Sequence, residues 1–170
     1  AGSHAAINAA REGAKVVVAD IKEEGGEETV RSITDAGGEA RFVKTDVSKS
    51  VEVEALIKET IEMYGRLDCA YNNAGILGDV VSIVNYTEES WNRVLDTNLK
   101  GTWLCMKYEI PQMLEQGSGS IVNTTAKTGL YIGGKYLPAY SASKAGIVSL
   151  SKVAALEYAE CGLRINVICP

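Results

Sequence analysis

The sequence predicts an α/β fold in which helices cover a parallel β-sheet. Short apolar runs rich in Val and Ile alternate along the chain with longer amphipathic segments, and most of these segments end near a glycine. Alternation of this kind requires right-handed crossovers between parallel strands. The length of 170 residues suits one domain.

The first half of the chain contains two predicted strands, each followed by a helix. Val16–Asp20 is continuously apolar before its final acid, which is typical of a strand buried on both faces. Lys22–Ala36 has apolar residues at helical spacing, and Arg41–Thr45 is the second strand. Ser48 is the expected N-cap of a helix that ends at Gly65.

The second half continues the alternation and adds one long helix. Thr87 precedes two glutamates and is the expected N-cap of a helix toward Gln116, bent at Pro111. The other expected elements are strands at Leu67–Tyr71, Ser120–Thr124 and Leu163–Cys169 and a helix at Ala139–Tyr158. Because ligands bind beyond the carboxyl ends of such strands, we expect a long crevice there. The unusual residues at those ends are Asp20, Asp46, Asn72–Gly75, Thr124–Ala126 and Pro170.

Composition argues against several classes of protein. The chain has 17 basic and 22 acidic residues, a net charge of −5 and no basic cluster, so nucleic-acid binding is not expected. No apolar stretch approaches the ~20 residues of a membrane span, and no signal peptide is visible. The four cysteines are expected to be reduced and mostly buried, which favours a cytoplasmic location. With His4 as its one histidine, the chain is not expected to hold a metal or a Ser-His-Asp triad.

Tyr140 and Lys144 carry the clearest chemical signal. Their spacing puts a phenol and an ammonium on one face of a predicted helix. A phenol is a poor acid–base catalyst at neutral pH, and a nearby positive charge improves it by stabilising the phenolate. Because a surface Tyr/Lys pair has the same spacing, the pattern indicates proton transfer only together with other motifs.

Three further motifs accompany this pair. They are Asn72–Gly75 after a strand, Asn98–Gly101 in the long helix and Asn166–Pro170 at the end of the last strand. In this order and spacing, the motifs resemble the classical short-chain dehydrogenase/reductase family over essentially the whole chain. The resemblance implies a Rossmann-like, doubly wound parallel sheet in a single three-layer α/β/α domain. It also implies an oxidoreductase that transfers hydride between a nicotinamide cofactor and a secondary alcohol or ketone.

The resemblance assigns catalytic roles residue by residue. Tyr140 is similar to the family's proton donor and acceptor, and Lys144 to the lysine that assists it and holds the nicotinamide ribose. Asn98 matches the asparagine that anchors a water behind this lysine, although taken alone it fits a helix amide bonded to backbone.

The resemblance also implies cofactor contacts. Asp20 can accept both hydroxyls of an adenosine ribose and would repel a 2′-phosphate, so NAD is favoured over NADP. Lys22 nearby keeps NADP as the less favoured option. The other expected cofactor-binding residues are Gly2, Ile21, Asp46, Val47, Asn73, Ala74, Gly75, Tyr140, Lys144 and Pro170.

The sequence departs from the family at one catalytic position. The serine that binds the substrate carbonyl falls on Ala126 or, counted back from Tyr140, on Lys127. Neither side chain carries a hydroxyl, and loss of such a donor lowers the rate by ~10²–10³. Thr125 is therefore the expected catalytic hydroxyl, with Thr128 as the other possibility.

Two segments of the family are not represented in the chain. Of the Gly-rich phosphate motif TGxxxGxG only Gly2 remains, and the family continues past Pro170 with the substrate lid. We therefore expect a segment truncated at both ends from a longer polypeptide. The absent first strand would stand in the middle of the sheet and leave two unpaired edges.

Other functions stay open beside the enzyme. A non-catalytic dinucleotide-binding or oligomeric scaffold module is favoured by Ala126 and would dimerise through the helices from Thr87 and Ala139. A flavodoxin-like or receiver domain would not depend on a Tyr/Lys pair. The P-loop-like run Gly129–Lys135 is followed by Tyr136 and not by Ser or Thr, so triphosphate hydrolysis is not expected.

The expected partners of the enzyme are a small-molecule alcohol or ketone and further copies of the chain. Two apolar loops, Ile76–Tyr86 and Gly129–Ala139, suggest a hydrophobic or cyclic substrate. The apolar residues in question are Ile76, Leu77, Val80, Val81, Leu130, Tyr131 and Ile132. A homodimer or homotetramer is expected, with no nucleic acid or membrane as partner.

Overall fold

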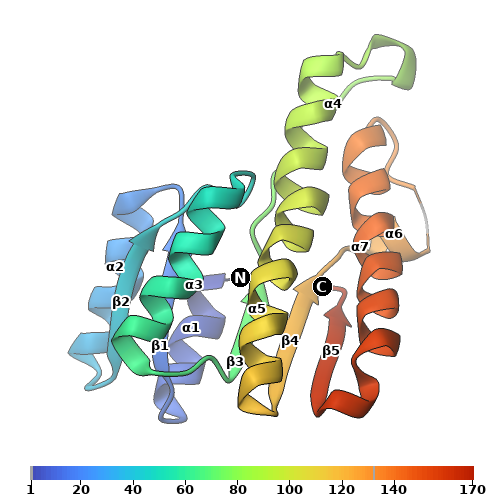
Figure 1. Cartoon of the computed structure of the whole chain (residues 1–170). Helices are drawn as coiled ribbons and strands as arrows, with labels where there is room; N and C mark the ends of the chain where they lie inside the picture. Colours follow the sequence, from blue (N-terminus) through green and yellow to red (C-terminus); the bar gives the residue numbers. More distant parts are fainter. Residues whose placement is uncertain (1, 132) are drawn as a thin grey trace. The chain divides into compact units, whose positions relative to one another are not determined.

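A computed structural model describes residues 2–131 and 133–170, and the chain divides into two units, Ala1–Arg66 and Leu67–Pro170 (Figure 1). All strand pairs in both units are parallel, as the sequence predicts. Ile132, one of the apolar loop residues, lies outside the described residues. The prediction of a single domain stays a prediction.

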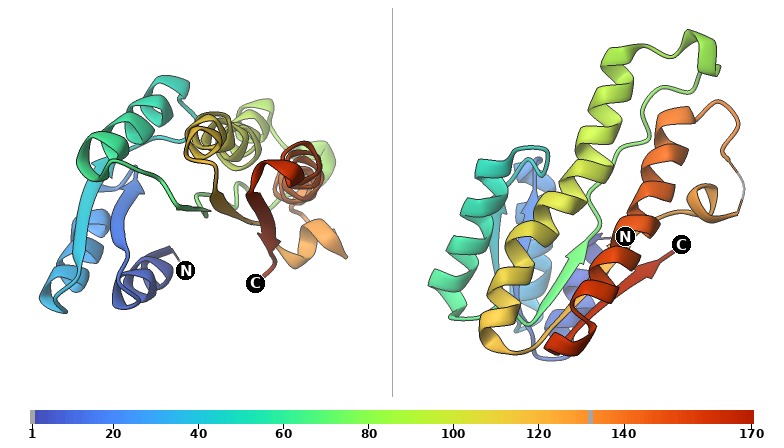
Figure 2. Two further views of the ribbon diagram at one scale, coloured as in Figure 1. Left: turned by 60° about the horizontal axis from the view of Figure 1, so that its bottom comes forward. Right: turned by 45° about the vertical axis from the view of Figure 1, so that its right-hand side comes forward.

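The first unit contains a two-stranded sheet with helices on both faces (Figure 2). Its strands are β1 (Lys15–Asp20) and β2 (Glu39–Lys44), and its helices are α1 (Gly2–Arg11), α2 (Glu23–Asp35) and α3 (Ser50–Tyr64). α1 and α2 pack against each other and the sheet, whereas α3 lies on the opposite face. The pairing sets Asp20 opposite Lys44, so both strands end at the same edge.

The second unit contains a three-stranded sheet in the order β3-β4-β5. The strands are β3 (Cys69–Asn72), β4 (Gly119–Thr124) and β5 (Leu163–Ile168). The helices are α4 (Glu88–Leu95), α5 (Gly101–Gln116), α6 (Lys127–Leu130) and α7 (Pro138–Glu157), with 3-10 turns η1 (Ile83–Asn85) and η3 (Ala159–Cys161) and the π-helical turn η2 (Asp96–Lys100). α5 and α7 cover one face of this sheet.

The apolar core of the second unit lies between its sheet and these two helices. Met106, Ile110 and Met113 of α5 pack with Ile121 of β4 and Ile165 of β5. β5 alternates buried and exposed residues, because only one of its faces meets the helices of its unit. Such alternation is what a half-covered strand requires.

A polar network crosses this core at the carboxyl ends of β3 and β4. Asn72 and Asn123 stand opposite each other in the sheet, and the Asn72 amide nitrogen donates to Asn123 Oδ1 and to Glu109 Oε2, at 3.0 Å each. The Asn123 amide nitrogen donates to Ser151 Oγ at 2.9 Å and to Met106 Sδ at 3.2 Å. The network therefore links β3, β4, α5 and α7 through hydrogen bonds that satisfy buried polar groups.

Several local predictions are wrong. Ser48 does not cap α3, whose N-cap is Lys49, because the Ser48 hydroxyl and backbone nitrogen both donate to Asp46 Oδ1. The long helix is not continuously α-helical, because Asp96–Lys100 form a π-helical turn. Pro111 lies inside α5, and the predicted bend there stays a prediction. Thr87 is confirmed as a cap, since its hydroxyl oxygen accepts from Ser90 N at 3.2 Å.

The predictions of burial for β1 and the cysteines also need correction. Val16–Val18 of β1 are only half-buried, because β1 pairs with β2 alone among the described residues. All four cysteines are free, but of these only Cys105 is buried, while Cys69 and Cys161 are exposed. Across residues 2–131 and 133–170, no helix is long and apolar enough to cross a membrane.

The buried carboxyl of Glu109 predicts a pH dependence of stability. Burial raises its pKa from 4.5 to about 7, and the hydrogen bond from Asn72 opposes the rise. Since the folded pKa lies above the unfolded one, Glu109 contributes stability at low pH that is lost as pH rises through about 7. Relative to Glu109→Gln, the wild-type free energy of unfolding should fall by on the order of 3 kcal/mol from acidic to mildly basic pH in denaturant titrations. A difference that stays constant with pH would contradict the assignment.

Candidate active site

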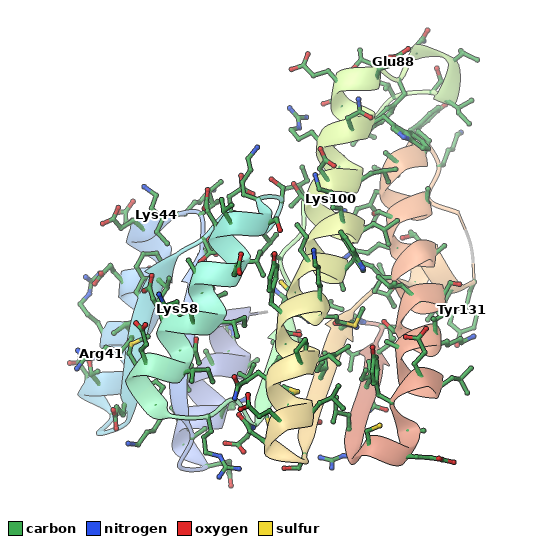
Figure 3. All side chains as sticks on the ribbon, viewed as in Figure 1. Arg41, Lys44, Lys58, Glu88, Lys100 and Tyr131 are labelled. Carbon is green, nitrogen blue, oxygen red and sulfur yellow. The ribbon has the colours of Figure 1, made fainter. Side chains whose placement is uncertain are left out.

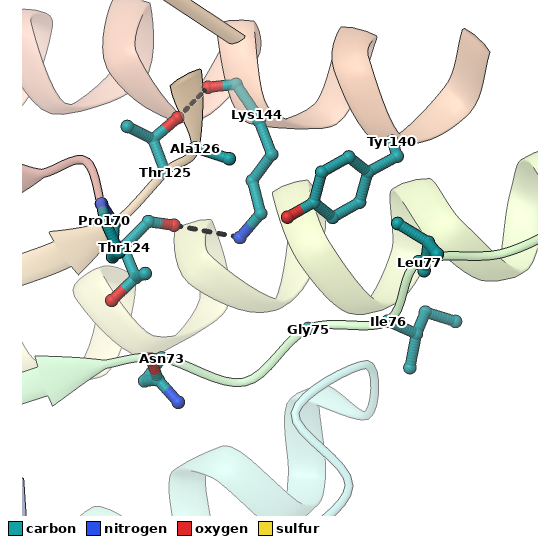
Figure 4. A pocket seen from close by; sticks show the side chains of 10 residues that line it. All are labelled: Asn73, Gly75, Ile76, Leu77, Thr124, Thr125, Ala126, Tyr140, Lys144 and Pro170. Carbon is teal, nitrogen blue, oxygen red and sulfur yellow. Dashed lines mark hydrogen bonds between the residues drawn. The ribbon is translucent and has the colours of Figure 1, made fainter. Parts of the chain in front are cut away.

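A cavity of about 300 Å³ opens at the carboxyl end of the sheet in the second unit. Residues that follow β3, end β4 and follow β5 line it, together with the first turns of α7 (Figure 4). The lining residues are Asn73, Gly75, Ile76, Leu77, Thr124, Thr125, Ala126, Tyr140, Lys144 and Pro170. The cavity thus lies where a parallel sheet places its ligands.

Lys144 brings a buried positive charge to this cavity. The residue is 4% exposed, and its ammonium donates to the carbonyl oxygen of Thr124 at 3.0 Å. Burial lowers the pKa of Lys144. No carboxylate pairs with it among the described residues, so its charge is balanced by a carbonyl dipole and stays available to a polar ligand.

Tyr140 lies one helical turn before Lys144 on α7. The Lys144 ammonium is 5.7 Å from the centre of the Tyr140 ring, so the predicted shared face is present. Figure 4 shows the Tyr140 hydroxyl and the Lys144 ammonium pointing into the same cavity. A nearby positive charge stabilises a phenolate, so a phenol in this position can both donate and accept a proton.

Asn98 binds the loop after β3, which forms one wall of the cavity. Its side chain is fully buried, accepts from Ile76 N at 2.8 Å and donates to Ile76 O at 2.9 Å. It also donates to Ser143 Oγ at 3.0 Å, and the Ser143 hydroxyl donates to the Tyr140 carbonyl at 2.7 Å. Asn98 therefore fixes the loop after β3 against α7, and its expected role as a water anchor stays a prediction.

The turn after β3 approaches Asn98 closely. A Cβ atom at Gly75 would lie 3.2 Å from Asn98 Oδ1 and 3.5 Å from Lys144 Nζ. Because hydrogen bonds fix Asn98 Oδ1, a side chain at residue 75 would crowd it while reaching ordinary contact with the Lys144 ammonium. Asn73 is also held, since its Oδ1 accepts from the Tyr71 hydroxyl at 3.1 Å, whereas Ala74 is exposed.

The expected catalytic hydroxyl of Thr125 already has a hydrogen-bond partner. Thr125 lines the cavity, and its hydroxyl donates to the Lys144 carbonyl at 2.6 Å and so anchors α7. Its expected catalytic role stays a prediction. Ala126 lines the cavity beside it, and Lys127 begins α6 as an exposed residue. Thr128 is absent from the lining, and its hydroxyl is buried without a partner among the described residues.

The remaining predicted cofactor residues lie in the first unit. Asp20 ends β1, and its Oδ1 accepts from Lys22 N at 2.8 Å. This bond orients the carboxylate at the start of α2. Asp46, just after β2, accepts at Oδ1 from Ser48, while its backbone nitrogen donates to Glu52 Oε2 at 2.7 Å. Ile21 is exposed, Val47 is half-buried and Gly2 begins the described part of α1.

The loop after β3 meets the loop before α7 through a backbone hydrogen bond. Val81 N donates to the carbonyl of Tyr136 at 3.0 Å, and Tyr136 adopts a left-handed conformation with φ of 64°. Ile76 and Leu77 reach the cavity lining, but Val80 is exposed, and Tyr131 projects into solvent with 81% of its surface exposed (Figure 3). Of the expected apolar residues, those nearest β3 are therefore the ones that line the site.

The whole chain, residues 1–170, matches the family described as short chain dehydrogenase. The chain belongs to this family. An uncharacterized oxidoreductase of Thermotoga maritima is 43% identical, with 99% of this chain and 66% of that protein covered. Cyclohexanol dehydrogenase of Acinetobacter sp. strain SE19 is 40% identical, with 99% and 67% covered. The crystal structure of NAD⁺-bound xylitol dehydrogenase is 31% identical with a TM-score of 0.95, over 99% of this chain and 64% of that one.

This short-chain dehydrogenase chain spans about two thirds of the length of the curated relatives it matches. The residues of the cavity fit a nicotinamide cofactor. The buried Lys144 ammonium, the Tyr140 phenol and the turn at Gly75, where a Cβ atom would come close to Asn98, all line one cavity. Among the described residues, no group of three His, Cys, Asp or Glu side chains could hold a metal, and His4 is exposed.

Two contacts at the site were not foreseen from the sequence. Thr124, expected at the crevice, supplies its backbone carbonyl to Lys144, and Ser143 connects Asn98 to α7. A backbone carbonyl has no sequence signature. Ser143, however, lies between Tyr140 and Lys144 in a helix, where a serine favours a partner for its hydroxyl, and this signal could have indicated it.

Proposed function

We propose that the whole protein is an NAD-dependent oxidoreductase that transfers hydride between the nicotinamide and a secondary alcohol or ketone. The observation that carries this proposal is the convergence of Tyr140 and the buried Lys144 ammonium on one cavity. Family membership supports it, because the relatives named above include a cyclohexanol dehydrogenase.

Several residues of the cavity have a defined role in this proposal. The bound cofactor supplies or accepts the hydride. Tyr140 gives a proton to the substrate oxygen during reduction and takes it back during oxidation, while the Lys144 ammonium stabilises the phenolate between these events. Lys144 and Tyr140 would also hold the nicotinamide ribose, with Asn73, Gly75 and Pro170 lining the cavity around it.

NAD is the proposed cofactor in preference to NADP. Asp20 ends β1 with a carboxylate that the backbone amide of Lys22 orients. A carboxylate accepts from ribose hydroxyls and repels a phosphate in their place. The NAD⁺-bound state of the xylitol dehydrogenase supports the same preference.

The proposed substrate is hydrophobic. Ile76 and Leu77 line the cavity beside Tyr140, and Ala126 presents a methyl group where the family uses a hydroxyl. An apolar wall favours an alcohol or ketone carried on a hydrocarbon ring or chain. Cyclohexanol, from the name of one relative, is therefore a reasonable first substrate to assay.

The proposed assembly is a homodimer or homotetramer. Apolar side chains are exposed on α5 and α7, the two helices that cover one face of the sheet in the second unit. They are Trp103, Leu114, Val153 and Leu156. Exposed apolar residues on neighbouring helices favour burial against a further copy of the chain.

A non-catalytic dinucleotide-binding module is the second candidate. Ala126 favours it, because its methyl group lines the cavity at the position where the family's serine presents a hydroxyl. Such a module would keep the cofactor pocket and lack turnover.

Tyr140→Phe should remove turnover and preserve cofactor binding. The phenylalanine cannot exchange a proton, so kcat should fall by ~10²–10⁴, while the NADH dissociation constant and thermal unfolding stay close to wild type. NADH absorbance in steady-state assays and NADH fluorescence titration measure the two effects, with Tyr158→Phe as the control. Near-normal turnover in Tyr140→Phe would remove Tyr140 from the proton transfer.

Ala126→Ser should distinguish a slow enzyme from a module. A new hydroxyl can donate to the developing oxyanion, and kcat should rise by up to ~10² if the wild type is an enzyme lacking this donor. Ala142→Ser, on the exposed surface of α7, is the matched control. NADH binding without turnover in either wild type or Ala126→Ser would favour the module.

A further inference from the structure

Glu109 is a buried acid that the proposed reaction does not use. It is 4% exposed on α5 and has no ion-pair partner among the described residues. Its partner is the side-chain amide of Asn72, the last residue of β3, at 3.0 Å. Burying a carboxyl that has no ion-pair partner is unfavourable, so we expect its acceptor oxygen to have a structural role.

The direction of the hydrogen bonds shows what the carboxyl does. The Asn72 amide nitrogen uses both protons, one toward Asn123 Oδ1 and one toward Glu109 Oε2. The Asn123 amide nitrogen in turn donates to Ser151 and Met106, and the Ser151 hydroxyl donates to the Ile147 carbonyl at 2.7 Å. Glu109 is therefore an acceptor at one end of the network, and it fixes the orientation of the Asn72 side chain.

Asn72 joins this network to the cavity. The residues that follow it, Asn73–Gly75, form the turn that approaches Asn98 and Lys144 with little spare room. A change in the side-chain position of Asn72 would move the start of this turn. Displacement of a positioning group by even a fraction of an ångström weakens binding at a site with such close contacts.

We propose that Glu109 is a positioning residue for the cofactor turn Asn73–Gly75 and acts through Asn72. The proposal rests on the proposed function, because the turn is assigned to a nicotinamide cofactor. Glu109 touches neither substrate nor cofactor in this scheme. Its role is to hold the end of β3 where Gly75 meets Lys144.

The electrostatics around Glu109 agree with this role. Glu109 is bonded to the neutral amide of Asn72, which also bonds Asn123, and Asn123 bonds the neutral hydroxyl of Ser151. A titratable group that interacts electrostatically with Glu109 is the thiol of Cys105. Burial raises the pKa of that thiol, with a further contribution from Glu109. Since an uncharged amide oxygen can replace the carboxyl as acceptor, Glu109→Gln should preserve the network, whereas Glu109→Met should leave an Asn72 proton unpaired.

The experiment compares wild type, Glu109→Gln, Glu109→Met and the control Met113→Ala in the full protein. Met113 is buried on the same helix and belongs to the apolar core but not to this network, so its variant reports destabilisation alone. Two quantities are measured: the NADH dissociation constant by fluorescence, and hydrogen exchange of the Asn73–Gly75 amides in the free protein. Steady-state kcat at saturating NADH is recorded beside them.

We expect changes in NADH binding and amide exchange that a general loss of stability would not produce. Glu109→Met should weaken NADH binding about tenfold and speed exchange at Asn73–Gly75, with a smaller change in kcat. Glu109→Gln should restore both readouts to within about threefold of wild type. Met113→Ala should leave both unchanged at a temperature where it remains folded.

Two results would overturn the proposal. If Glu109→Met changes neither NADH binding nor amide exchange while wild type binds NADH, the positioning role fails and the proposed function stands. If Glu109→Met and Met113→Ala weaken binding equally, the effect is general destabilisation. Wild type that binds no NADH would instead overturn the proposed function, and the role in cofactor binding would fail with it.

Discussion

The hydrogen bond between the Lys144 ammonium and the Thr124 carbonyl is the contact on which the site depends. An ammonium this deeply buried requires a compensating dipole, and the carbonyl at the end of β4 supplies it. The Thr125 hydroxyl binds the Lys144 carbonyl from the same strand end. Thr124 and Thr125 thus bind the ammonium and the backbone carbonyl of Lys144, respectively. These bonds fix α7, which also positions Tyr140 at the cavity.

Close packing makes this arrangement specific. A Cβ at Gly129 would lie 2.5 Å from the Lys144 carbonyl carbon, so α6 can approach α7 only with a glycine there. On the other side, Asn98 binds both backbone groups of Ile76 and sets the distance between the turn after β3 and α7. Backbone groups that follow β3 and end β4, and not long side chains alone, therefore define the site.

The sequence predicted what local patterns encode. The strands, the Thr87 cap and the shared face of Tyr140 and Lys144 follow from short spacings, and the structure confirms them. The bonds of Asn98, Thr125 and Glu109 join residues 19 to 45 positions apart, and no local pattern reveals such partners. The sequence therefore could not show that the Thr125 hydroxyl bonds the backbone of α7. Glu109 was missed because a glutamate in a helix ordinarily faces water.

The most direct test of this account is the NADH affinity of Lys144→Met compared with Lys152→Met. Both variants remove an ammonium from α7, but Lys152 is exposed and lies outside the cavity. The account predicts that Lys144→Met weakens NADH binding by at least about tenfold, while Lys152→Met binds as wild type does. Equal affinities in the two variants, in protein that remains folded, would contradict the assignment of the cavity to the nicotinamide cofactor.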